Sequence, residues 1–576
     1  MKLSLKAIMT FTVTALLLVG LSSEAFAQMY KAGPQDLTFF SSADETNQPY
    51  SIYIPKDYDE NEDYPLVIFL HGAMSNNRLG LRRAFGLGNI QGTSFTSPGF
   101  VHKESDLEVS RSWPEMPDID FIVAAPFARG TAGYRGIPEQ DVYDMLADIK
   151  EKFNVDEDRI YLTGLSMGGG GTVWLGLTRP DIWAAIAPCC AAPPTGAMDL
   201  YRNASNLPVH IFCGDKDGLL PNSIALKEKF EGIGSPVVNY IEYPGIGHNS
   251  WEYAYDKGFI FEWFSQFERD LFPQRVQFSS KLFKYNKAYW VTFDNLTPGT
   301  LAIIDAKFTA QNTIEVSSTD LLAFTLKLKG HPMFNPGKSV TVKVDGKSFS
   351  VKSPDMISFT KENGEWKNRK YTPGLTAKQK GAEGPLVAAI NSNHIYVYGT
   401  ADNPSNEELN ARMAQALEAA TWANTRGSYL NTAFVFPRVV SDQRLRQSDY
   451  DLCNLVLFGT KETNAIIAQY ADKLPMHLDK NVKDHGLVYI FPMNGKYVLI
   501  NSGLPWWTPY KGGGSPSSIL DGAGKSGYLA NSTSDFILFK EAADNIIIQG
   551  NFDSNWELTK TSVNSLVSIS IVTVNE

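Results

Sequence analysis

A serine between glycines lies at the junction of a β-like and a helix-like segment of this sequence. The run Gly164-Leu165-Ser166-Met167-Gly168 follows the apolar stretch 159–163 and leads into helical spacing over 168–178. A serine on a sharp strand-to-helix turn needs glycine two residues to either side, because a Cβ there would collide with the backbone. The first N–H groups of the helix also face developing negative charge. We therefore predict Ser166 as the nucleophile of an acyl transfer.

A serine hydroxyl needs a general base, and on such a turn the order along the chain is nucleophile, acid, histidine. The strand-like run 209–213 leads into an acidic turn that holds Asp217, the predicted acid, with Asp215 as the alternative. His248 lies in a glycine-flanked loop just before a helix-like segment and is the predicted base. His210 lies within a strand-like run, so we interpret it as structural.

A second strand-like run, 66–70, ends in His71-Gly72-Ala73. The turn after such a strand offers a backbone N–H to the substrate oxygen, so Ala73 and Met167 form the predicted oxyanion hole, and His71 is interpreted as structural. In the predicted mechanism the serine attacks an acyl carbonyl, the histidine takes its proton and the acid fixes the imidazole tautomer. Water then repeats the steps on the acyl-enzyme.

Aromatic side chains near these motifs are candidates for a substrate pocket. Trp251, Tyr134 and Trp113 are the predicted contacts to a phenolic or sugar ring, and Trp174 is a further candidate. Packing in the core is the alternative for each of them. In the C-terminal part, Trp506-Trp507 either stacks on a carbohydrate or packs beneath a loop.

The sequence contains no motif typical of a cofactor or metal site. It lacks H-E-x-x-H, paired C-x-x-C and a G-x-G-x-x-G that opens a helix after a strand. We therefore predict neither a cofactor nor a metal. The net charge is -10, with both signs dispersed along the chain, which argues against a nucleic-acid partner.

The N-terminus predicts export. Residues 1–27 combine Lys2 and Lys6, an apolar stretch and a small-x-small site that ends at Ala27, as in a cleavable signal peptide. We expect a secreted or periplasmic bacterial protein without a membrane span after cleavage. Only four cysteines occur, so disulfides are not its main source of stability. Cys189 or Cys190 pairs with Cys213 if their strands are adjacent; buried thiols are the alternative.

Strand-like and helix-like segments alternate from 28 to 272, which predicts a mostly parallel sheet covered by helices. The expected strands are 50–54, 66–70, 121–125, 159–163, 184–188, 209–213 and 239–243, and the expected helices are 140–153, 168–178, 222–232 and 250–271. Residues 78–118 fit neither pattern and are expected to form a loop or small cap over the active face.

Two accessory domains are expected after this catalytic domain. From 273 to 372, short alternating runs between Asn-Pro-Gly and Asp-Gly turns predict a small β-sandwich. From 373 to 576, strands and helices alternate again, which predicts a second, open α/β domain of flavodoxin-like type. Its expected strands are 385–390, 395–398, 432–437, 454–458, 486–491, 497–501, 535–538 and 546–550, and its expected helices are 406–424 and 463–471.

Four stretches resemble secreted feruloyl and acetyl-xylan esterases: Arg129-Gly130, Glu139-Gln-Asp141-Val142, the run from Asp158 to Trp174, and Arg179-Pro-Asp-Ile-Trp183-Ala-Ala. They are similar also to polyhydroxybutyrate-depolymerase-like esterases and, more distantly, to the prolyl oligopeptidase catalytic domain. The resemblance covers 34–270 and implies an α/β-hydrolase fold and a serine esterase with the triad Ser166, Asp217 and His248. Two features depart from the family pattern: the long segment 78–118, and three glycines at 169–171, which we expect to loosen the first helical turn.

Three hypotheses about function follow. The favoured one is an esterase that acts on a small ester or an esterified plant polysaccharide, with possible carbohydrate contacts through the C-terminal domains. A serine peptidase of prolyl oligopeptidase type is the second, but no segment before the catalytic domain accommodates the propeller that this resemblance implies. A non-catalytic carbohydrate-binding protein is the third, and the complete triad in the expected order argues against it. The sequence indicates no oligomeric state.

Overall fold

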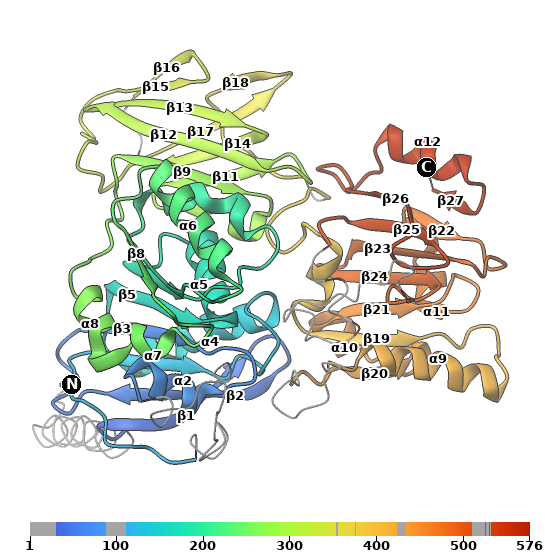
Figure 1. Ribbon diagram of the computed structural model, residues 1–576. Coiled ribbons are helices and arrows are strands. Elements are labelled where there is room, and N and C mark those ends of the chain that lie inside the picture. The colour runs from blue at the N-terminus through green and yellow to red at the C-terminus, as the bar shows by residue number, and fades with distance from the viewer. Residues whose placement is uncertain are drawn as a thin grey trace, which may run out of the picture.

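The computed structural model describes residues 30–87, 111–352, 355–374, 376–422, 434–509, 525, 529 and 532–575. Figure 1 shows an eight-stranded sheet stacked below two five-stranded sheets, with a seven-stranded sheet beside this stack. The expected signal peptide, 1–27, lies outside the described residues. Among the helices that the structure describes, none has the length and apolar character needed to cross a bilayer.

The eight-stranded sheet forms the N-terminal part and has the order β1-β2-β4-β3-β5-β6-β7-β8. The pairs β1/β2 and β2/β4 are antiparallel, and every later pair of neighbours is parallel. The strands are β1 (Gly33–Ser41), β2 (Thr46–Ile54), β3 (Tyr64–Leu70), β4 (Ile122–Pro126), β5 (Val155–Leu165), β6 (Ala185–Cys189), β7 (Val209–Gly214) and β8 (Val238–Tyr243).

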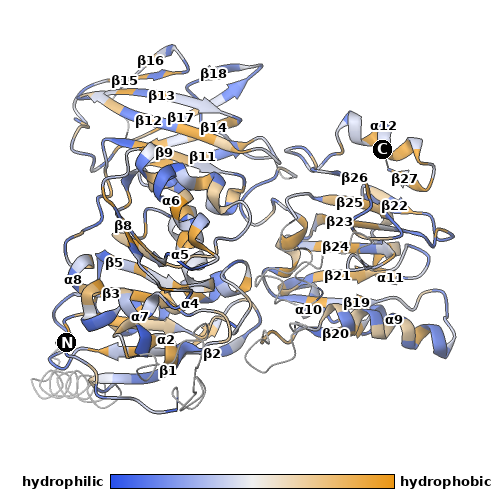
Figure 2. Ribbon diagram, viewed as in Figure 1, coloured by the Kyte–Doolittle hydropathy of each residue, from blue (hydrophilic) through white to orange (hydrophobic). Residues whose placement is uncertain are grey.

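Successive residues of the central strands face opposite sides of this sheet. On β3, Leu66, Ile68 and Leu70 pack into one buried cluster, whereas Val67 and Phe69 pack into another. Both faces are therefore apolar, as the orange central strands in Figure 2 show, and this explains the unbroken apolar runs in the sequence. The first cluster includes residues of α4 (Ile137–Lys152), α5 (Met167–Thr178) and α6 (Leu220–Gly232), and the second includes residues of α2 (Asn77–Ala84) and α8 (Phe259–Phe264).

One expectation for this part is wrong, and a second falls partly outside the described residues. The single helix expected over 250–271 is broken into α7 (Trp251–Ala254), the 3₁₀ turn η2 (Asp256–Gly258) and α8, because Lys257 and Gly258 adopt positive φ angles of 53° and 72°. The segment 78–118, expected to form a loop or small cap, begins within α2, which is capped by the Asn76 side chain that accepts from Leu79 N–H at 3.0 Å. Residues 88–110 of that segment lie outside the described residues.

Two five-stranded sheets follow, with the orders β10-β11-β14-β17-β18 and β16-β15-β13-β12-β9. They share one apolar core, in which Phe278 and Phe293 from opposite sheets have ring centroids 4.9 Å apart. The strands are β9 (Arg275–Ser280), β10 (Lys287–Ala288), β11 (Val291–Leu296), β12 (Ala302–Ala310), β13 (Thr313–Thr319), β14 (Leu321–Lys327), β15 (Val340–Val344), β16 (Lys347–Val351), β17 (Met356–Glu362) and β18 (Glu365–Lys367). The 3₁₀ turns η1 (Ala197–Asn206) and η3 (Phe283–Tyr285) lie where the first two parts meet.

The C-terminal sheet has the order β20-β19-β21-β24-β23-β25-β26. Its first four strands are parallel, and the later pairs are antiparallel. The elements are η4 (Leu386–Ile390), β19 (His394–Tyr398), α9 (Asn406–Ala419), β20 (Arg438–Ser441), η6 (Asp442–Arg444), α10 (Gln447–Leu452), β21 (Asn454–Phe458), α11 (Ala465–Gln469), η7 (Ala471–Lys473), β22 (Met476–Leu478), β23 (His485–Met493), β24 (Lys496–Gly503), β25 (Phe536–Lys540), β26 (Ile546–Gly550), α12 (Lys560–Ser568) and β27 (Val572–Val574). Strands β22 and β27 form a separate pair.

Two strands expected here differ from the structure. The apolar run 385–390 forms the 3₁₀ turn η4, in which Leu386, Ala389 and Ile390 are all buried, and a short buried helix of this kind has no periodicity that separates it from a strand. The strand expected at 432–437 is instead β20, Arg438–Ser441; residues 434–437 form no strand, and 432 and 433 lie outside the described residues.

Candidate active site

Ser166 lies on the turn between β5 and α5. Its backbone has φ 56° and ψ −114°, a strained conformation for a residue with a side chain. The turn is held from one side by a hydrogen bond of 2.9 Å from Ser166 N–H to the carbonyl of Cys189, and from the other by a bond of 3.1 Å from Ala192 N–H to the Ser166 carbonyl. This raised hydroxyl at the end of a central strand is the position that the motif predicted.

The glycines around this turn leave no room for a Cβ. A Cβ on Gly164 would lie 2.6 Å from the carbonyl oxygen of Leu70, and one on Gly168 would overlap the same oxygen. A Cβ on Gly169 or Gly170 would overlap the carbonyl oxygen of Cys189 or Ala192. The extra glycines therefore allow α5 to pack closely on neighbouring backbone, and the expectation that they loosen its first turn is wrong.

His248 and Asp217 meet Ser166 in one chain of hydrogen bonds. His248 Nε2 lies 2.9 Å from Ser166 Oγ, and His248 Nδ1 lies 2.9 Å from Asp217 Oδ2. A proton on Nδ1 satisfies both contacts, because Nδ1 then donates to the carboxylate and Nε2 accepts from the hydroxyl. The other carboxylate oxygen of Asp217 accepts from Leu219 N–H at 3.0 Å, which fixes the acid in place.

The alternative acid, Asp215, has a different partner. Its Oδ1 accepts from Gly245 N–H at 2.8 Å, and its Oδ2 lies 3.4 Å from Lys216 Nζ. Asp215 thus ties the strand end to the loop that carries His248, whereas Asp217 faces the imidazole itself. The structure brings Asp217, and not Asp215, to the histidine.

The hydrogen bond between Asp217 and His248 shifts the pKa of both groups. Burial alone would lower the pKa of His248, but the bond to Asp217 and the negative charge of that carboxylate outweigh it, so the pKa of the imidazole lies above its ordinary value. Burial would raise the pKa of Asp217, but the hydrogen bonds from His248 and Leu219 N–H hold it below its ordinary value. The pair is thus poised as carboxylate and basic imidazole, as a general base requires.

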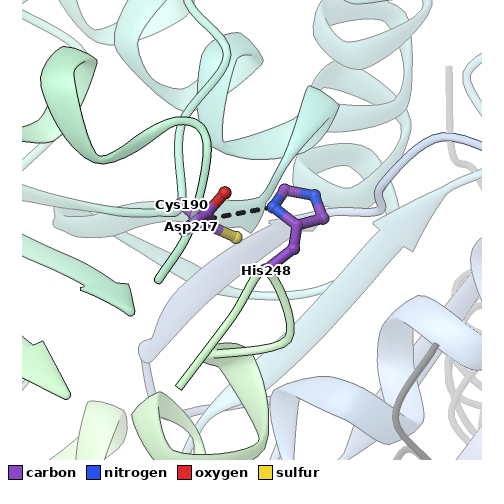
Figure 3. A group of neighbouring side chains, drawn as sticks. All are labelled: Cys190, Asp217 and His248. Carbon is purple, nitrogen blue, oxygen red and sulfur yellow. Dashed lines mark hydrogen bonds and ion pairs between the residues drawn. The ribbon is translucent and has the colours of Figure 1, made fainter. Parts of the chain in front are cut away.

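The thiol of Cys190 lies beside this pair. Figure 3 shows Cys190, Asp217 and His248 pointing toward one another, and their ligand-type atoms lie within 4.8 Å of one another. Burial raises the pKa of the Cys190 thiol well above its ordinary value, so it is protonated near neutral pH, whereas a metal would need the thiolate and the imidazole nitrogen that bonds Asp217. The arrangement therefore suits a hydrogen-bonded triad better than a metal centre.

The cysteines are thiols in this structure. All four, Cys189, Cys190, Cys213 and Cys453, are free and buried. Cys213 Sγ lies 3.7 Å from Asp217 Oδ2, so it also contacts the acid. Cys213 stands four residues before Asp217 in the chain, whereas Cys190 comes close to this acid because β6 and β7 are neighbouring strands, so the proximity of Cys190 had no signal in the sequence.

The residues that carry the two expected oxyanion donors lie close to Ser166 in the structure. Met167 is the first residue of α5, and the first helical bond there runs from Gly170 N–H to the Ser166 carbonyl, so the N–H of Met167 precedes the hydrogen-bonded turns. The turn that holds Ala73 is also close, since a Cβ on Gly72 would lie 3.6 Å from Ser166 Cβ. The His71 ring contacts the carbonyls of Gly72 and Phe127 at 2.7 and 2.8 Å, which anchors this turn.

Two of the aromatic candidates are partly exposed. The ring centroid of Trp251 lies 5.4 Å from that of His248, edge to face, so this indole borders the triad. Trp113 lies under the guanidinium of Arg78, with the guanidinium carbon 5.4 Å from the ring centroid. Its ring packs against the apolar cluster that includes residues of α2 and α8.

The other aromatic candidates are buried, which is at odds with substrate contact. Tyr134 is 2% exposed and donates to the His71 carbonyl at 3.0 Å, so it stabilises the turn His71-Gly72-Ala73. Trp174 is 6% exposed and donates to Glu139 Oε2 at 3.2 Å. Trp506 and Trp507 are buried as well, with Trp506 stacked on Phe458 at 5.6 Å, so packing and not carbohydrate stacking explains this pair.

A mixed sheet with a strained serine at one strand end, and with an acid and a histidine that follow later strands, defines the α/β-hydrolase class. Residues 41–220 match the family model described as "Putative esterase". Over these residues the chain matches this esterase family and resembles feruloyl esterases, and its fold and its Ser-His-Asp arrangement are those of the serine hydrolases of the α/β-hydrolase class.

Three relatives illustrate the similarity. "Probable feruloyl esterase C" of Aspergillus niger is 24% identical over 205 residues, which is 35% of this chain and 68% of that protein. Cutinase 1 of Thermobifida cellulosilytica is 33% identical over 97 residues, 16% of this chain and 34% of the cutinase. The crystal structure of a thermostable esterase is 25% identical and covers 41% of this chain and 63% of that chain, with a TM-score of 0.31. The chain thus spans about a third of the cutinase.

Proposed function

We propose that this protein is an exported carboxylic-ester hydrolase that removes feruloyl or acetyl groups from plant polysaccharide. The observation that carries the proposal is the continuous hydrogen-bond chain from Asp217 through His248 to Ser166. The similarity of residues 41–220 to the esterase family supports ester hydrolysis, and the feruloyl esterase relative supports the choice of acyl group.

The geometry supports a mechanism through an acyl-enzyme. Ser166 Oγ attacks the ester carbonyl while His248 Nε2 takes its proton, and Asp217 stabilises the imidazolium that forms. The N–H groups of Met167 and Ala73 hold the negative oxygen of the tetrahedral intermediate. His248 then gives the proton to the leaving alcohol, and water enters and reverses these steps to release the acid.

Trp251 supports an aromatic acyl group or a sugar ring at this site. Its indole stands edge to face with His248, and the guanidinium carbon of Arg83 lies 5.4 Å from the ring centroid. Because this indole is partly exposed and held in place, it offers an apolar surface next to the reacting carbonyl. The proposal keeps Trp251 and Trp113 as substrate contacts.

The remaining parts of the proposal concern the whole chain. Residues 1–27 serve as a signal peptide that directs the protein to the periplasm or the medium, and 28–272 form the catalytic domain. Residues 273–372 form a β-sandwich accessory domain, and 373–576 form an accessory α/β domain of flavodoxin-like type. The two five-stranded sheets with a shared core and the parallel strands β20, β19, β21 and β24 support these assignments.

A substrate panel tests the proposal. The purified protein is assayed on methyl ferulate, an acetylated xylo-oligosaccharide and a peptide amide, and Trp251→Ala is compared with Trp113→Ala on each. We expect hydrolysis of the esters and none of the amide. Loss of the Trp251 ring should raise KM for methyl ferulate more than KM for the acetylated sugar. Hydrolysis of the amide alone would replace the proposal with a peptidase, and no hydrolysis of any substrate would favour a binding protein.

A further inference from the structure

A pocket with a volume of about 850 Å³ lies where the catalytic unit meets both later parts of the chain. One wall comes from residues near the start of α4 and the end of α5, a second from the segment around η3, and a third from the C-terminal unit between Lys378 and Ser392 and around Tyr497. Ser166, Asp217 and His248 do not line it. It is therefore a separate site from the proposed active site.

Positive charge dominates the wall of this pocket. Seven basic side chains line it against three acidic ones: Arg135, Arg179, Lys281, Lys284, Lys378, Lys380 and Lys496 against Asp199, Glu383 and Asp535. Three of the lysines have partners within the protein. Lys281 pairs with Asp199 at 2.8 Å, Lys284 pairs with Glu139 at 3.0 Å, and Lys378 pairs with Asp535.

The other four basic groups, Arg135, Arg179, Lys380 and Lys496, form no ion pair with any residue that the structure describes. The guanidinium of Arg135 stacks on Trp174 at 4.6 Å, and that of Arg179 stacks on Tyr143 at 4.4 Å. Stacking uses the faces of these guanidinium groups and not their N–H edges. On that edge, Nη1 of Arg135 donates to the Thr195 carbonyl at 3.4 Å, which leaves the other N–H groups of Arg135 for a ligand. The Nε of Arg179 is buried and has no hydrogen-bond partner among the described residues.

The one acidic group without a cationic partner does not neutralise this excess. Burial raises the pKa of Glu383 to about 8, so its carboxyl is mostly protonated near neutral pH, and it accepts from Lys284 N–H at 3.0 Å. Burial and then the neighbouring charges of Arg179 and Lys284 lower the pKa of Lys380. Uncompensated cations around one pocket repel each other, and an anion bound between them would remove that repulsion.

The rest of the wall is suited to a sugar. Amide and hydroxyl side chains of Gln140, Asn391, Asn551 and Thr195 line the pocket beside the charged groups. These groups donate and accept hydrogen bonds, as sugar hydroxyls require. The volume lies in the range of pockets that hold organic ligands, and it exceeds what a single inorganic anion needs.

We propose that this pocket binds an acidic saccharide through its carboxylate. Arg179 and Arg135 present the planar N–H edges that match a carboxylate, Lys380 adds charge at the rim, and the amides contact the hydroxyls of the sugar. Trp174 lies eight residues after Ser166 on α5, so the pocket and the nucleophile are separated by about 12 Å along the helix axis. Binding here involves no ester bond, and it stands or falls independently of the proposed hydrolysis.

The test is calorimetric titration of the purified protein with trigalacturonate, xylotriose and inorganic phosphate. Trigalacturonate has the carboxylates and the hydroxyls, xylotriose has only the hydroxyls, and phosphate has only the charge. We expect binding of trigalacturonate that weakens with added salt, with xylotriose and phosphate each at least about tenfold weaker. Equal affinity for xylotriose or for phosphate would overturn the proposal, as would the absence of trigalacturonate binding.

Two variants localise the binding. Lys380→Glu reverses an exposed charge at the rim, and Arg179→Gln removes the guanidinium; each should weaken trigalacturonate binding by about tenfold or more. Lys307→Glu makes the same charge change at an exposed position of β12, outside the pocket, and should bind like the wild type. All three should hydrolyse a small ester at the wild-type rate, which also shows that they fold. Wild-type binding by Lys380→Glu would overturn the site, even if Arg179→Gln fails to fold.

Discussion

Asp217 and His248 are joined by a hydrogen bond of 2.9 Å between Oδ2 and Nδ1, although 31 residues separate them in the chain. The bond exists because β7 and β8 are parallel neighbours, so the turn after β7 and the loop after β8 end at the same edge of the sheet. Ser166 is raised at that same edge by the turn after β5. One edge of one sheet thus positions all three side chains.

Replacing the acid tests its role against that of its neighbour. Asp217→Asn keeps the size of the side chain but favours the wrong imidazole tautomer, so kcat should fall by about 10⁴-fold. Asp215→Asn is the matched control; it removes the negative charge that faces Gly245 N–H and Lys216 but not the acid that contacts His248, and its kcat should stay within about tenfold of the wild type. If Asp215→Asn shows the larger loss, the acid has been assigned to the wrong carboxylate.

The rate should depend on pH through His248. Only the neutral imidazole accepts a proton from Ser166, and the bond to Asp217 raises the pKa of this histidine above its ordinary value. The value of kcat/KM should therefore rise with pH through an apparent pKa above about 6.5 and be lost as pH falls below it. In Asp217→Asn this apparent pKa should move down. An apparent pKa below about 6.5 in the wild type is the outcome that contradicts the prediction.

The glycine run on α5 should be intolerant of any side chain. Gly170→Ala places a Cβ against the carbonyl of Ala192, so it should lower the free energy of unfolding by about 1–3 kcal/mol or more. Gly232→Ala, at the end of α6, is the control, because a Cβ there meets nothing within 4 Å, and its stability should stay within about 0.5 kcal/mol or increase. Denaturant unfolding followed by circular dichroism measures both. Equal stability of the two variants would contradict the close packing of α5.

Arg129 should be required for stability rather than for catalysis. Its buried guanidinium bonds Asp141 at 2.5 Å, pairs with Asp44, and donates to Ser41 Oγ at 2.8 Å. Arg129→Met leaves a buried carboxylate without its partner, so the free energy of unfolding should fall by about 3–5 kcal/mol. Arg159→Met breaks the partly exposed pair with Asp156 and should cost less than about 1 kcal/mol. A similar loss in both variants, measured by denaturant unfolding, would show that burial does not decide the cost.

The sequence contains enough information to predict the three candidate side chains and the sheet that carries them. Ser166 is marked by glycines that a tight turn requires, and Asp217 and His248 are marked by their positions after strand-like runs. The apolar runs of β3, β5, β6 and β7 reflect burial on both faces of a parallel sheet, which is a local property of the sequence. The proximity of Ser166, Asp217 and His248 then follows from the fold. The catalytic roles of these three residues and the domain boundaries stay predictions.

Other features depend on tertiary packing and had no local signal. Tyr134, Trp506 and Trp507 stand near turns in the sequence, but their exposure depends on distant segments that cover them, such as Phe458 beneath Trp506. The helix expected over 250–271 is broken at Lys257, which has a positive φ although lysine is not a residue type that predicts one. The basic pocket combines residues from three parts of the chain, and the spacing of its cations in the sequence carries no trace of their convergence.

The assignment of Ser166 as the nucleophile can be tested with a single substitution. Ser166→Ala removes the hydroxyl that His248 contacts at 2.9 Å and leaves the oxyanion donors in place. We predict that kcat for p-nitrophenyl acetate falls by at least about 10⁴-fold while the variant stays folded, as judged by its circular dichroism and thermal unfolding. Hydrolysis at close to the wild-type rate by a folded Ser166→Ala protein would contradict the proposed mechanism.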